Sequence, residues 1–500
     1  MGVLSNLQPE KVFYYFEEIS KIPHGSGNVG QISDYLVKFA RERNLTVMQD
    51  DIKNVIMIKE ATAGYEQEPT VILQGHMDMV AVKKPDCDID MRTEGLRLGV
   101  DGDNIYAEGT SLGGDDGIAV AYALALLDSE ELCHPRLEIV ITVDEEVGMD
   151  GAREIDLSML EGRRLLNLDS EEEGIFLASC AGGAGVSCRL SMERKQDRGT
   201  VCDLFIGGLL GGHSGEEIHK ARGNSNVLFG RALWLLSASY SVRLVSVEGG
   251  LADNAIPGET RAKLLLPDDY SGCVKLLEQM EKDVAEELGV RDPDFRMEWK
   301  IGSAEDLEAL SAADTRRAAA MLYALPNGVQ TMSADMPGLV ETSLNMGILR
   351  LENAVRAEDA ADMTDAAGAA TLTAEFSVRS SVESAKADLI ARLRAIAELA
   401  GGIVEVKGVY PGWKYRADSP LRDKMIRVYR RMYDAEPRVE AIHAGLECGL
   451  LAGKIQDLDC VSIGPDMKNI HTTEETLSIS SAARVWEYLV EFLAEKDEER

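Results

Sequence analysis

Long apolar runs and closely spaced cysteines are both missing from this chain of 500 residues. No run approaches the roughly 20 apolar residues that a membrane-spanning helix needs, and we expect no signal peptide at the N-terminus. The eight cysteines are scattered, and none forms a C-x-x-C pair. This spacing argues against a zinc ribbon or a dithiol redox site, so reduced thiols in a cytoplasmic protein are the simplest interpretation.

An excess of positive charge is also missing. Lysine and arginine total 52 against 86 aspartates and glutamates, which gives a formal net charge of −34. Phosphates would repel such a chain, so the charge argues against a nucleic-acid partner. Hydrophobic residues make up 45% of the chain and charged residues 28%, a balance typical of a globular protein. The length predicts two or more domains.

Helical and extended patterns alternate along the first part of the chain. Apolar residues recur at helical spacing in residues 8–22, 28–44 and 118–127. Short apolar runs predict strands at residues 45–48, 54–58, 70–75, 137–143 and 165–168. This alternation predicts an α/β fold with a mostly parallel sheet flanked by helices. The Gly- and Asp-rich residues 101–117 are expected to form a loop.

The pattern changes near residue 183, where a run of small residues interrupts it. From there to about residue 401, strand-like runs accompany long helical stretches, and α/β character then returns. We therefore expect one domain in two parts, residues 1–186 and 402–500, interrupted by an inserted α+β domain at residues 187–401. Within the insertion, the Ala- and Asp-rich residues 357–370 predict a solvated helix or loop.

Polar residues directly follow the strand predicted at residues 70–75, in the segment T-V-I-L-Q-G-H-M-D-M. Open α/β sheets bind their ligands at the carboxyl ends of the strands. His76 and Asp78 are two residues apart, so in an extended segment both project to the same side. A metal-binding imidazole usually has a carboxylate or carbonyl at its other ring nitrogen. The pair indicates a metal ligand with its orienting acid; the alternative is a structural histidine beside a solvated aspartate.

Four more polar groups follow apolar strands or glycine turns. They are Asp115 in G-G-D-D-G, Glu145 and Glu146 in D-E-E-V-G, Asp169 in N-L-D, and His471 in N-I-H. Each alone could be a solvated turn in so acidic a chain. Together they offer imidazoles and carboxylates, which suit zinc, with manganese or cobalt as substitutes. Two metals would need one shared carboxylate and separate ligands on each side.

The adjacent glutamates Glu145 and Glu146 lie at a predicted strand end, so their side chains point in different directions. One can bind metal while the other faces a water. A carboxylate near a metal-bound water can take its proton and later pass it to a leaving amine. These five groups of residues therefore predict a metal-dependent hydrolytic site.

The order of these motifs resembles that of the dinuclear zinc peptidases related to carnosinases and aminoacylases. It is most similar to the aminoacyl-histidine dipeptidases, also called cytosol non-specific or Xaa-His dipeptidases. Supporting stretches are I-S-K-I-P-H at 19–24, G-G-H-S-G at 211–215, G-L-V-E-T-S at 338–343, Y-P-G-W at 410–413 and H-A-G-L-E-C-G at 443–449. The chain departs from many relatives at T-T-E-E, residues 472–475, where those relatives have Ser-Pro after the last histidine.

This resemblance implies two zinc ions and a role for each candidate residue in the two-part catalytic domain. Asp78 would orient the imidazole of His76, and Glu145 would be the general base and acid. Asp115, rather than Asp116, would bridge the two metals. The implied metal ligands are His76, Asp115, Glu146, Asp169 and His471.

The insertion would then be a lid that closes over the substrate. By the same resemblance, His213 would stabilise the oxyanion of the tetrahedral intermediate. Asn254 and Arg379 would hold the carboxylate of the substrate, a task that suits the planar fork of arginine. His443 lies in a glycine motif of the family, and no role is assigned to it.

The resemblance implies a cytoplasmic zinc metallopeptidase that hydrolyses dipeptides, with a preference for C-terminal histidine left open. Its partner would be a small peptide, not nucleic acid or membrane, and a homodimer is expected from the frequency of two-fold oligomers. One alternative is an N-acyl amino acid deacylase or a tripeptide aminopeptidase of the same family. Another is a catalytically silent protein that binds peptides in the presence of metal.

Overall fold

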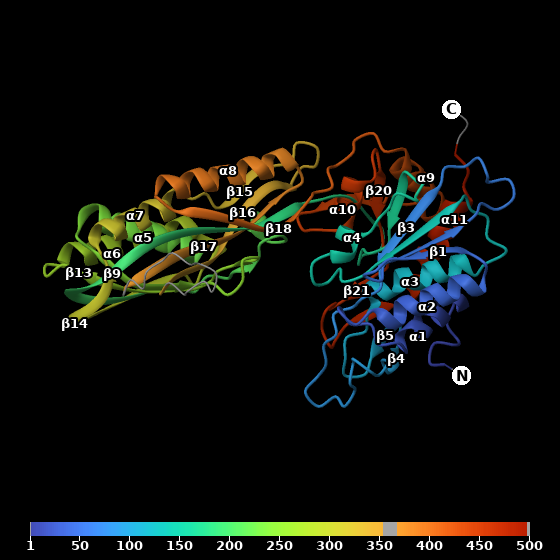
Figure 1. The fold of residues 1–500 in the computed structure, drawn as a ribbon, viewed down its shortest axis with the longest axis horizontal. Helices are drawn as coiled ribbons and strands as arrows, with labels where there is room; N and C mark the ends of the chain where they lie inside the picture. The colour runs from blue at the N-terminus through green and yellow to red at the C-terminus, as the bar shows by residue number, and fades with distance from the viewer. Residues whose placement is uncertain (1, 354–367, 498–500) are drawn as a thin grey trace. The chain divides into compact units, whose positions relative to one another are not determined.

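The computed structural model describes residues 2–353 and 368–497, so most of the stretch at 357–370 lies outside the described residues. The chain forms two compact units (Figure 1). Unit 1 comprises Met1–Cys180, Trp413–Ala441 and Leu446–Arg500, and unit 2 comprises Ala181–Gly412 and Ile442–Gly445. Unit 2 begins earlier than the predicted insertion because strand β9 (Gly182–Gly207) lies within it. It ends later because strand β18 (Ile403–Tyr410) pairs with β9.

Unit 1 is built on an eight-stranded sheet in the order β1-β2-β6-β3-β7-β20-β8-β19. The strands are β1 Thr46–Gln49, β2 Val55–Lys59, β3 Val71–His76, β6 Leu137–Thr142, β7 Arg164–Asn167, β8 Ile175–Cys180, β19 Arg438–Ile442 and β20 Asp459–Ser462. The central strands β6, β3, β7 and β20 run parallel, whereas β2 and β8 pair antiparallel with their neighbours. The predicted α/β class with a largely parallel sheet is confirmed.

Helices cover this sheet because its strands are apolar on both faces. Val71 and Leu73 of β3 enter a large core, while Ile72 between them is fully buried on the opposite face. That core also takes side chains from α1 Glu10–Ser20, α2 Gly30–Glu42, α3 Gly114–Leu127, α9 Pro420–Tyr433 and α11 Ile479–Ala494. The shorter helices are α4 Asp150–Glu154 and α10 Glu447–Lys454.

A smaller sheet of unit 1 corrects one prediction. Residues 101–117 are not a continuous loop, because β5 (Asn104–Ala107) pairs with β4 (Leu98–Asp101) and with β22 (Thr476–Ser478). Strand β22 pairs in turn with β21 (Met467–Lys468). The alternating pattern of β5 is only four residues long, which is too short to recognise among glycines and aspartates. This sheet fixes the segment of His471, between β21 and β22, near the segment that leads to Asp115.

Unit 2 contains two copies of one βαββαβ topology that share the 26-residue strand β9 (Gly182–Gly207). The first copy uses the C-terminal part of β9, α5 Ser225–Ser239, β11 Arg243–Gly249, β13 Thr260–Leu266, α6 Ser271–Leu288 and β14 Arg296–Leu310. Its strand order is β11-β13-β9-β14. The second copy uses the N-terminal part of β9, α7 Ala312–Ala324, β16 Val340–Asn353, β17 Ala369–Ser380, α8 Glu383–Leu399 and β18. Its order, β16-β17-β9-β18, is the same in topology.

Helices α5 to α8 pack on one face of this sheet, where they share a single hydrophobic core with the strands (Figure 1). The remaining short elements of unit 2 are β10 Gly212–His213, η1 Ile218–Lys220, β12 Ala255–Ile256, η2 Gly289–Arg291 and β15 Gly328–Met332. Across the described parts of both units, no helix is both long enough and apolar enough to span a membrane.

Candidate active site

Three adjacent parallel strands of unit 1 deliver polar residues to the same edge of the sheet. His76 ends β3, Glu145 and Glu146 follow β6, and Asp169 follows β7. The residue before His76 must be small. A Cβ at Gly75 would lie 2.4 Å from a carboxylate oxygen of Asp116 at the start of α3. Gly75 therefore allows α3 to pack close to β3 and brings the Asp115–Asp116 turn to this edge.

Asp115 lies between the two imidazoles. Its Oδ1 is 3.1 Å from Nε2 of His76, and its Oδ2 is 3.1 Å from Nε2 of His471. Nε2 of His76 is also 3.5 Å from Asp169, and Nε2 of His471 is 2.9 Å from Glu146. The structure thus brings all five predicted ligands together, with one carboxylate facing both halves of the cluster.

Asp78 supports this cluster through two different groups. Its backbone carbonyl accepts a hydrogen bond from Nδ1 of His76 at 2.9 Å, which directs Nε2 toward Asp115. Its carboxylate is 3.5 Å from the same ring nitrogen. That carboxylate instead accepts hydrogen bonds from the backbone N–H of Glu145 at 3.0 Å and from the hydroxyl of Ser26 at 2.8 Å. Asp78 therefore positions both His76 and the turn that carries Glu145.

The donor set fits divalent cations. Three groups of possible ligand atoms each lie within 4.8 Å of one another: His76, Asp116 and Asp169; His76, Glu145 and Glu146; and Asp115, Glu146 and His471. Oδ1 of Asp116 is buried without a hydrogen-bond partner in the described residues. Burial also raises the pKa of Asp169 to about 8 and the pKa of Glu145 well above its usual value. Cations would offset this uncompensated negative charge and favour the ionised forms.

Glu475 is a supporting residue that the sequence reasoning missed. Its carboxylate accepts backbone N–H groups of Leu112 at 2.8 Å, Gly113 at 3.2 Å and Gly114 at 2.8 Å. These bonds hold the turn that presents Asp115. Glu475 lies in the T-T-E-E stretch that departs from many relatives. This difference was the feature of the sequence that could have drawn attention to Glu475.

Glu447 is a second missed residue, located beneath the strand ends at the start of α10. It is fully buried, and its carboxylate accepts hydrogen bonds from the amide of Gln74 and, at 2.6 Å, from the hydroxyl of Thr142. Burial is the main reason that its pKa is raised to about 7. Glu447 ties β3 and β6 together next to the ligands that these strands carry. Its place in the H-A-G-L-E-C-G motif was the only sequence signal.

The three residues predicted to bind substrate lie together in unit 2. His213 of β10 pairs with Ala255 of β12, and the backbone N–H of Ser214 donates to the carbonyl of Asn254 at 2.8 Å. Burial and then the nearby charge of Arg379 lower the pKa of His213, so its imidazole is neutral near pH 7. Arg379 itself is 7% exposed and donates from Nη1 to the hydroxyl of Tyr410 at 3.2 Å.

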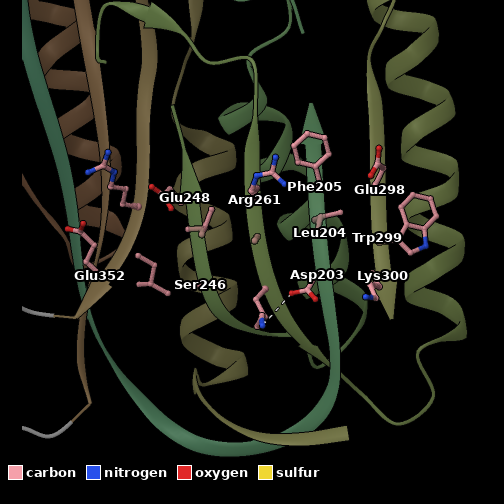
Figure 2. Close-up of a pocket in the computed structure, with 15 residues that line it drawn as sticks. Asp203, Leu204, Phe205, Ser246, Glu248, Arg261, Glu298, Trp299, Lys300 and Glu352 are labelled. Atoms are coloured by element: carbon pink, nitrogen blue, oxygen red, sulfur yellow. Dashed lines mark ion pairs between the residues drawn. The ribbon is translucent and has the colours of Figure 1, made fainter. Parts of the chain in front are cut away.

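A hollow of about 680 Å³ lies elsewhere in unit 2, on the sheet face of the first βαββαβ copy (Figure 2). Its side chains come mainly from β9, β11, β13 and β14, and Figure 2 shows them standing along the strands. Arg261 lies over the ring of Phe205, 4.4 Å from its centroid, and Lys263 is 3.5 Å from Asp203. The lining contains neither imidazole nor thiol, so this hollow lacks the ligand set of unit 1.

Residues 72–495 match the sequence profile of peptidase family M20/M25/M40, and the match includes every predicted ligand. The chain belongs to this family. It is therefore a metal-dependent peptidase, which confirms the class of enzyme predicted from the order of the motifs.

This M20 peptidase is similar to several relatives over nearly its full length. It is 36% identical over 498 residues to the cytosol non-specific dipeptidase of Escherichia coli (strain K12), and the match covers 99% of both chains. Its structure matches that of the aminoacylhistidine dipeptidase from Vibrio alginolyticus with a TM-score of 0.90 and 35% identity, again over 99% of each chain. Aminopeptidase PepT from Bacillus cereus ATCC 10987 shares the fold, with a TM-score of 0.58 at 17% identity over 98% of each chain.

Proposed function

We propose that this M20 peptidase is a dipeptidase that hydrolyses the single peptide bond of unsubstituted dipeptides with two zinc ions bound. The observation that carries the proposal is the position of Asp115, whose two oxygens each lie 3.1 Å from a different imidazole. Such a carboxylate suits a bridge between two cations. The full-length similarity to two dipeptidases supports the substrate class.

The ligands divide into two sets around Asp115. His76 and Asp169 would complete one set, and Glu146 and His471 the other, according to the distances between their atoms. Imidazole and carboxylate ligands suit zinc, and manganese or cobalt can substitute. When bound, the two cations would polarise the carbonyl of the peptide bond and lower the pKa of the attacking water.

Glu145 is the proposed general base and acid. It lies within the ligand cluster, next to Glu146, and its backbone N–H is held by the carboxylate of Asp78. From this position its carboxylate takes the proton of the attacking water and returns it to the amine of the leaving residue. Asp78 is the positioning residue for this step, because it fixes both His76 and the Glu145 turn.

Three residues of unit 2 are proposed to bind the substrate. His213, which is kept neutral by burial and by Arg379, would donate a hydrogen bond to the oxyanion that forms at the carbonyl. Arg379 and Asn254 would hold the free carboxylate of the dipeptide. A site that requires this carboxylate next to the scissile bond would exclude longer peptides.

The first test measures metal content and turnover on one sample purified without chelator. We expect close to two zinc ions per chain, hydrolysis of Gly-His and carnosine, loss of activity on chelation, and recovery when zinc is supplied. A tripeptide and an N-acetyl amino acid are assayed in parallel. Faster turnover of either one would replace the dipeptidase by a tripeptide aminopeptidase or a deacylase. Two metals with tight peptide binding and no turnover would indicate a binding protein instead.

The second test replaces Glu145 by Gln. Activity should fall about 10²- to 10⁴-fold, the usual contribution of a general base, while the zinc content stays unchanged. Glu154→Gln is the matched control, because Glu154 is exposed on α4 shortly after the same turn. Near wild-type activity in the Glu145→Gln variant would exclude this mechanism.

A cytoplasmic location and a homodimer complete the proposal. The name of the Escherichia coli relative supports the location, and the scattered cysteines agree with a reducing compartment. The homodimer rests on the general frequency of two-fold oligomers. Light scattering that gave the mass of a single chain would exclude the dimer.

A further inference from the structure

A row of four residues crosses the sheet of unit 2 on the face opposite the helices. The strand register sets Ser343 of β16 beside Arg379 of β17, Arg379 beside Gly183 of β9, and Gly183 beside Tyr410 of β18. A Cβ at Gly183 would lie 2.4 Å from the ring of Tyr410. The glycine therefore leaves room for the phenol to reach Nη1 of Arg379, and this contact fixes one side of the guanidinium.

The Nε side of the Arg379 guanidinium has no hydrogen-bond partner in the described part of the chain. The side chain is only 7% exposed. An unsatisfied buried N–H on a charged group is costly. The planar fork of arginine matches a carboxylate, so this unpartnered side suits the carboxylate of a bound dipeptide.

Ser343 is held by His443, the histidine to which the sequence assigned no role. Oγ of Ser343 is 2.7 Å from Nε2 of His443, and both side chains are buried. Burial, assisted by the charge of Arg379, lowers the pKa of His443 to about 3, so its imidazole is neutral. A hydrogen bond with the backbone of Val340 acts in the opposite direction, as an N–H donated to a carbonyl does.

We assign the single N–H of the neutral His443 ring to Nδ1, because Nε2 faces Ser343 at 2.7 Å and the carbonyl of Val340 can take the proton of the other nitrogen. With this assignment Nε2 accepts the hydroxyl proton of Ser343. With its proton used in this way, Oγ of Ser343 can offer only lone pairs to a ligand. It stands next to the guanidinium that we expect to hold the substrate carboxylate.

We propose that Ser343, positioned by His443, accepts a hydrogen bond from the side chain of the C-terminal residue of the dipeptide and so selects for residues with an N–H or O–H donor. This inference rests on the proposed dipeptidase function and on Arg379 as the carboxylate site. It makes Ser343 a specificity residue and His443 its positioning residue. An apolar C-terminal side chain would leave the lone pairs of Ser343 unsatisfied.

The test measures binding of the product amino acid by calorimetry on the zinc-loaded protein, so that it does not depend on turnover. Wild-type protein should bind L-histidine more tightly than L-leucine. Ser343→Ala should weaken binding of L-histidine about 2- to 10-fold, the range for a neutral hydrogen bond, and leave L-leucine within about twofold. The ratio of kcat/KM for Gly-His and Gly-Leu should change by the same factor, through KM.

Two variants of His443 separate positioning from packing. His443→Gln keeps an acceptor for Ser343 and a donor for Val340, so the preference for L-histidine should persist. His443→Phe fills a similar volume without either group and should abolish the preference as Ser343→Ala does. The matched control is Ser380→Ala, because Ser380 is a buried hydroxyl on the opposite face of the same strands, 2.8 Å from Thr342.

Each remaining outcome has a definite meaning. Equal weakening of both amino acids in Ser343→Ala, or no weakening of either, would overturn the role of Ser343. So would a wild-type protein that shows no preference or binds neither amino acid. Absence of dipeptide turnover combined with a Ser343-dependent preference for L-histidine would instead refute the proposed function and leave the donor-selective site in place.

Discussion

The two units collect opposite kinds of polar group. Unit 1 crowds the carboxylates of Asp115, Glu146 and Asp169 around two imidazoles, and burial raises the pKa of several acids there. Unit 2 instead gathers the imidazoles of His213 and His443 near the buried guanidinium of Arg379, and burial and Arg379 lower the pKa of both rings. The first arrangement favours binding a cation, and the second favours binding an anion.

This difference shows how a histidine takes its role from its surroundings. His76 and His471 lie against the carboxylate of Asp115 in a negatively charged cluster, so we propose them as metal ligands. His213 and His443 are next to a positive charge and remain neutral, so they act through directed hydrogen bonds. Substitutions in both clusters can test this contrast.

Asp115→Asn should have the largest effect, because it removes the charge between the two imidazoles. We expect loss of at least one zinc ion per chain and a fall in activity of about a thousandfold or more, since several kcal/mol of charge stabilisation corresponds to about three powers of ten. Zinc per chain and kcat/KM are measured on the same sample. Asp86→Asn, a change of an exposed aspartate, should alter neither; an Asp115→Asn enzyme with two zinc ions would argue against the bridge.

His213→Ala should lower kcat about 10²- to 10³-fold, the usual effect of losing one donor to an oxyanion. Zinc content should not change, because His213 belongs to unit 2 and the ligands belong to unit 1. The exposed His219→Ala serves as the control. If His213→Ala raises KM at unchanged kcat, the residue binds the ground state and not the transition state.

Glu475→Ala should have an intermediate effect. It leaves the buried N–H groups of Leu112, Gly113 and Gly114 without their acceptor, at a cost of about 1–3 kcal/mol for an unsatisfied group. Zinc affinity should fall about 10- to 100-fold, as for other residues that support a ligand. Thermal unfolding and zinc titration measure the two effects. Glu474→Ala removes only an exposed ion pair with Lys84 and is the matched control, which should change neither quantity measurably.

His443 should make the smallest contribution, and it should depend on pH. The pKa of His443 is about 3 in the folded chain and about 6.5 when unfolded, so the unfolded chain binds the extra proton between these values. The contribution of neutral His443 to the free energy of unfolding is therefore fully present above about pH 6.5, and it is lost as the pH falls. Relative to His443→Gln, the wild type should lose on the order of 1–2 kcal/mol between pH 7 and pH 5. Denaturant unfolding of both proteins at each pH measures this loss. A difference in free energy of unfolding that stayed the same at every pH would contradict the expectation.

Much of unit 1 could be predicted because its signals are local. The apolar runs at β3, β6 and β7 are short, with Glu138 of β6 as a break, and each is followed by a candidate ligand. Carboxyl ends of parallel strands lie at one edge, so the sequence alone could bring His76, Glu146 and Asp169 together. The supporting acids could not be found in this way. Glu475 acts on Gly114 across 361 positions, and no local pattern encodes such a contact.

Unit 2 was harder to predict for the same physical reason. The N-terminal half of β9 pairs with β17 and β18, which lie far along the chain, while its C-terminal half pairs with β13 and β14. The sequence indicated an inserted α+β domain with long helices, but not that it holds one topology twice. The Ser343–His443 contact joins residues 100 positions apart, so the role of His443 became visible only in the structure.

Strand β9 has a mechanical consequence for unit 2. One continuous strand of 26 residues runs through both βαββαβ copies, and β11 of the first copy also pairs with β16 of the second. Unfolding of either copy would therefore release one end of a strand that the other copy uses and one strand pairing between the copies. Unit 2 should therefore unfold in a single cooperative transition. A force that shifts the register of β9 in one copy should also disturb the strand pairing of the other copy.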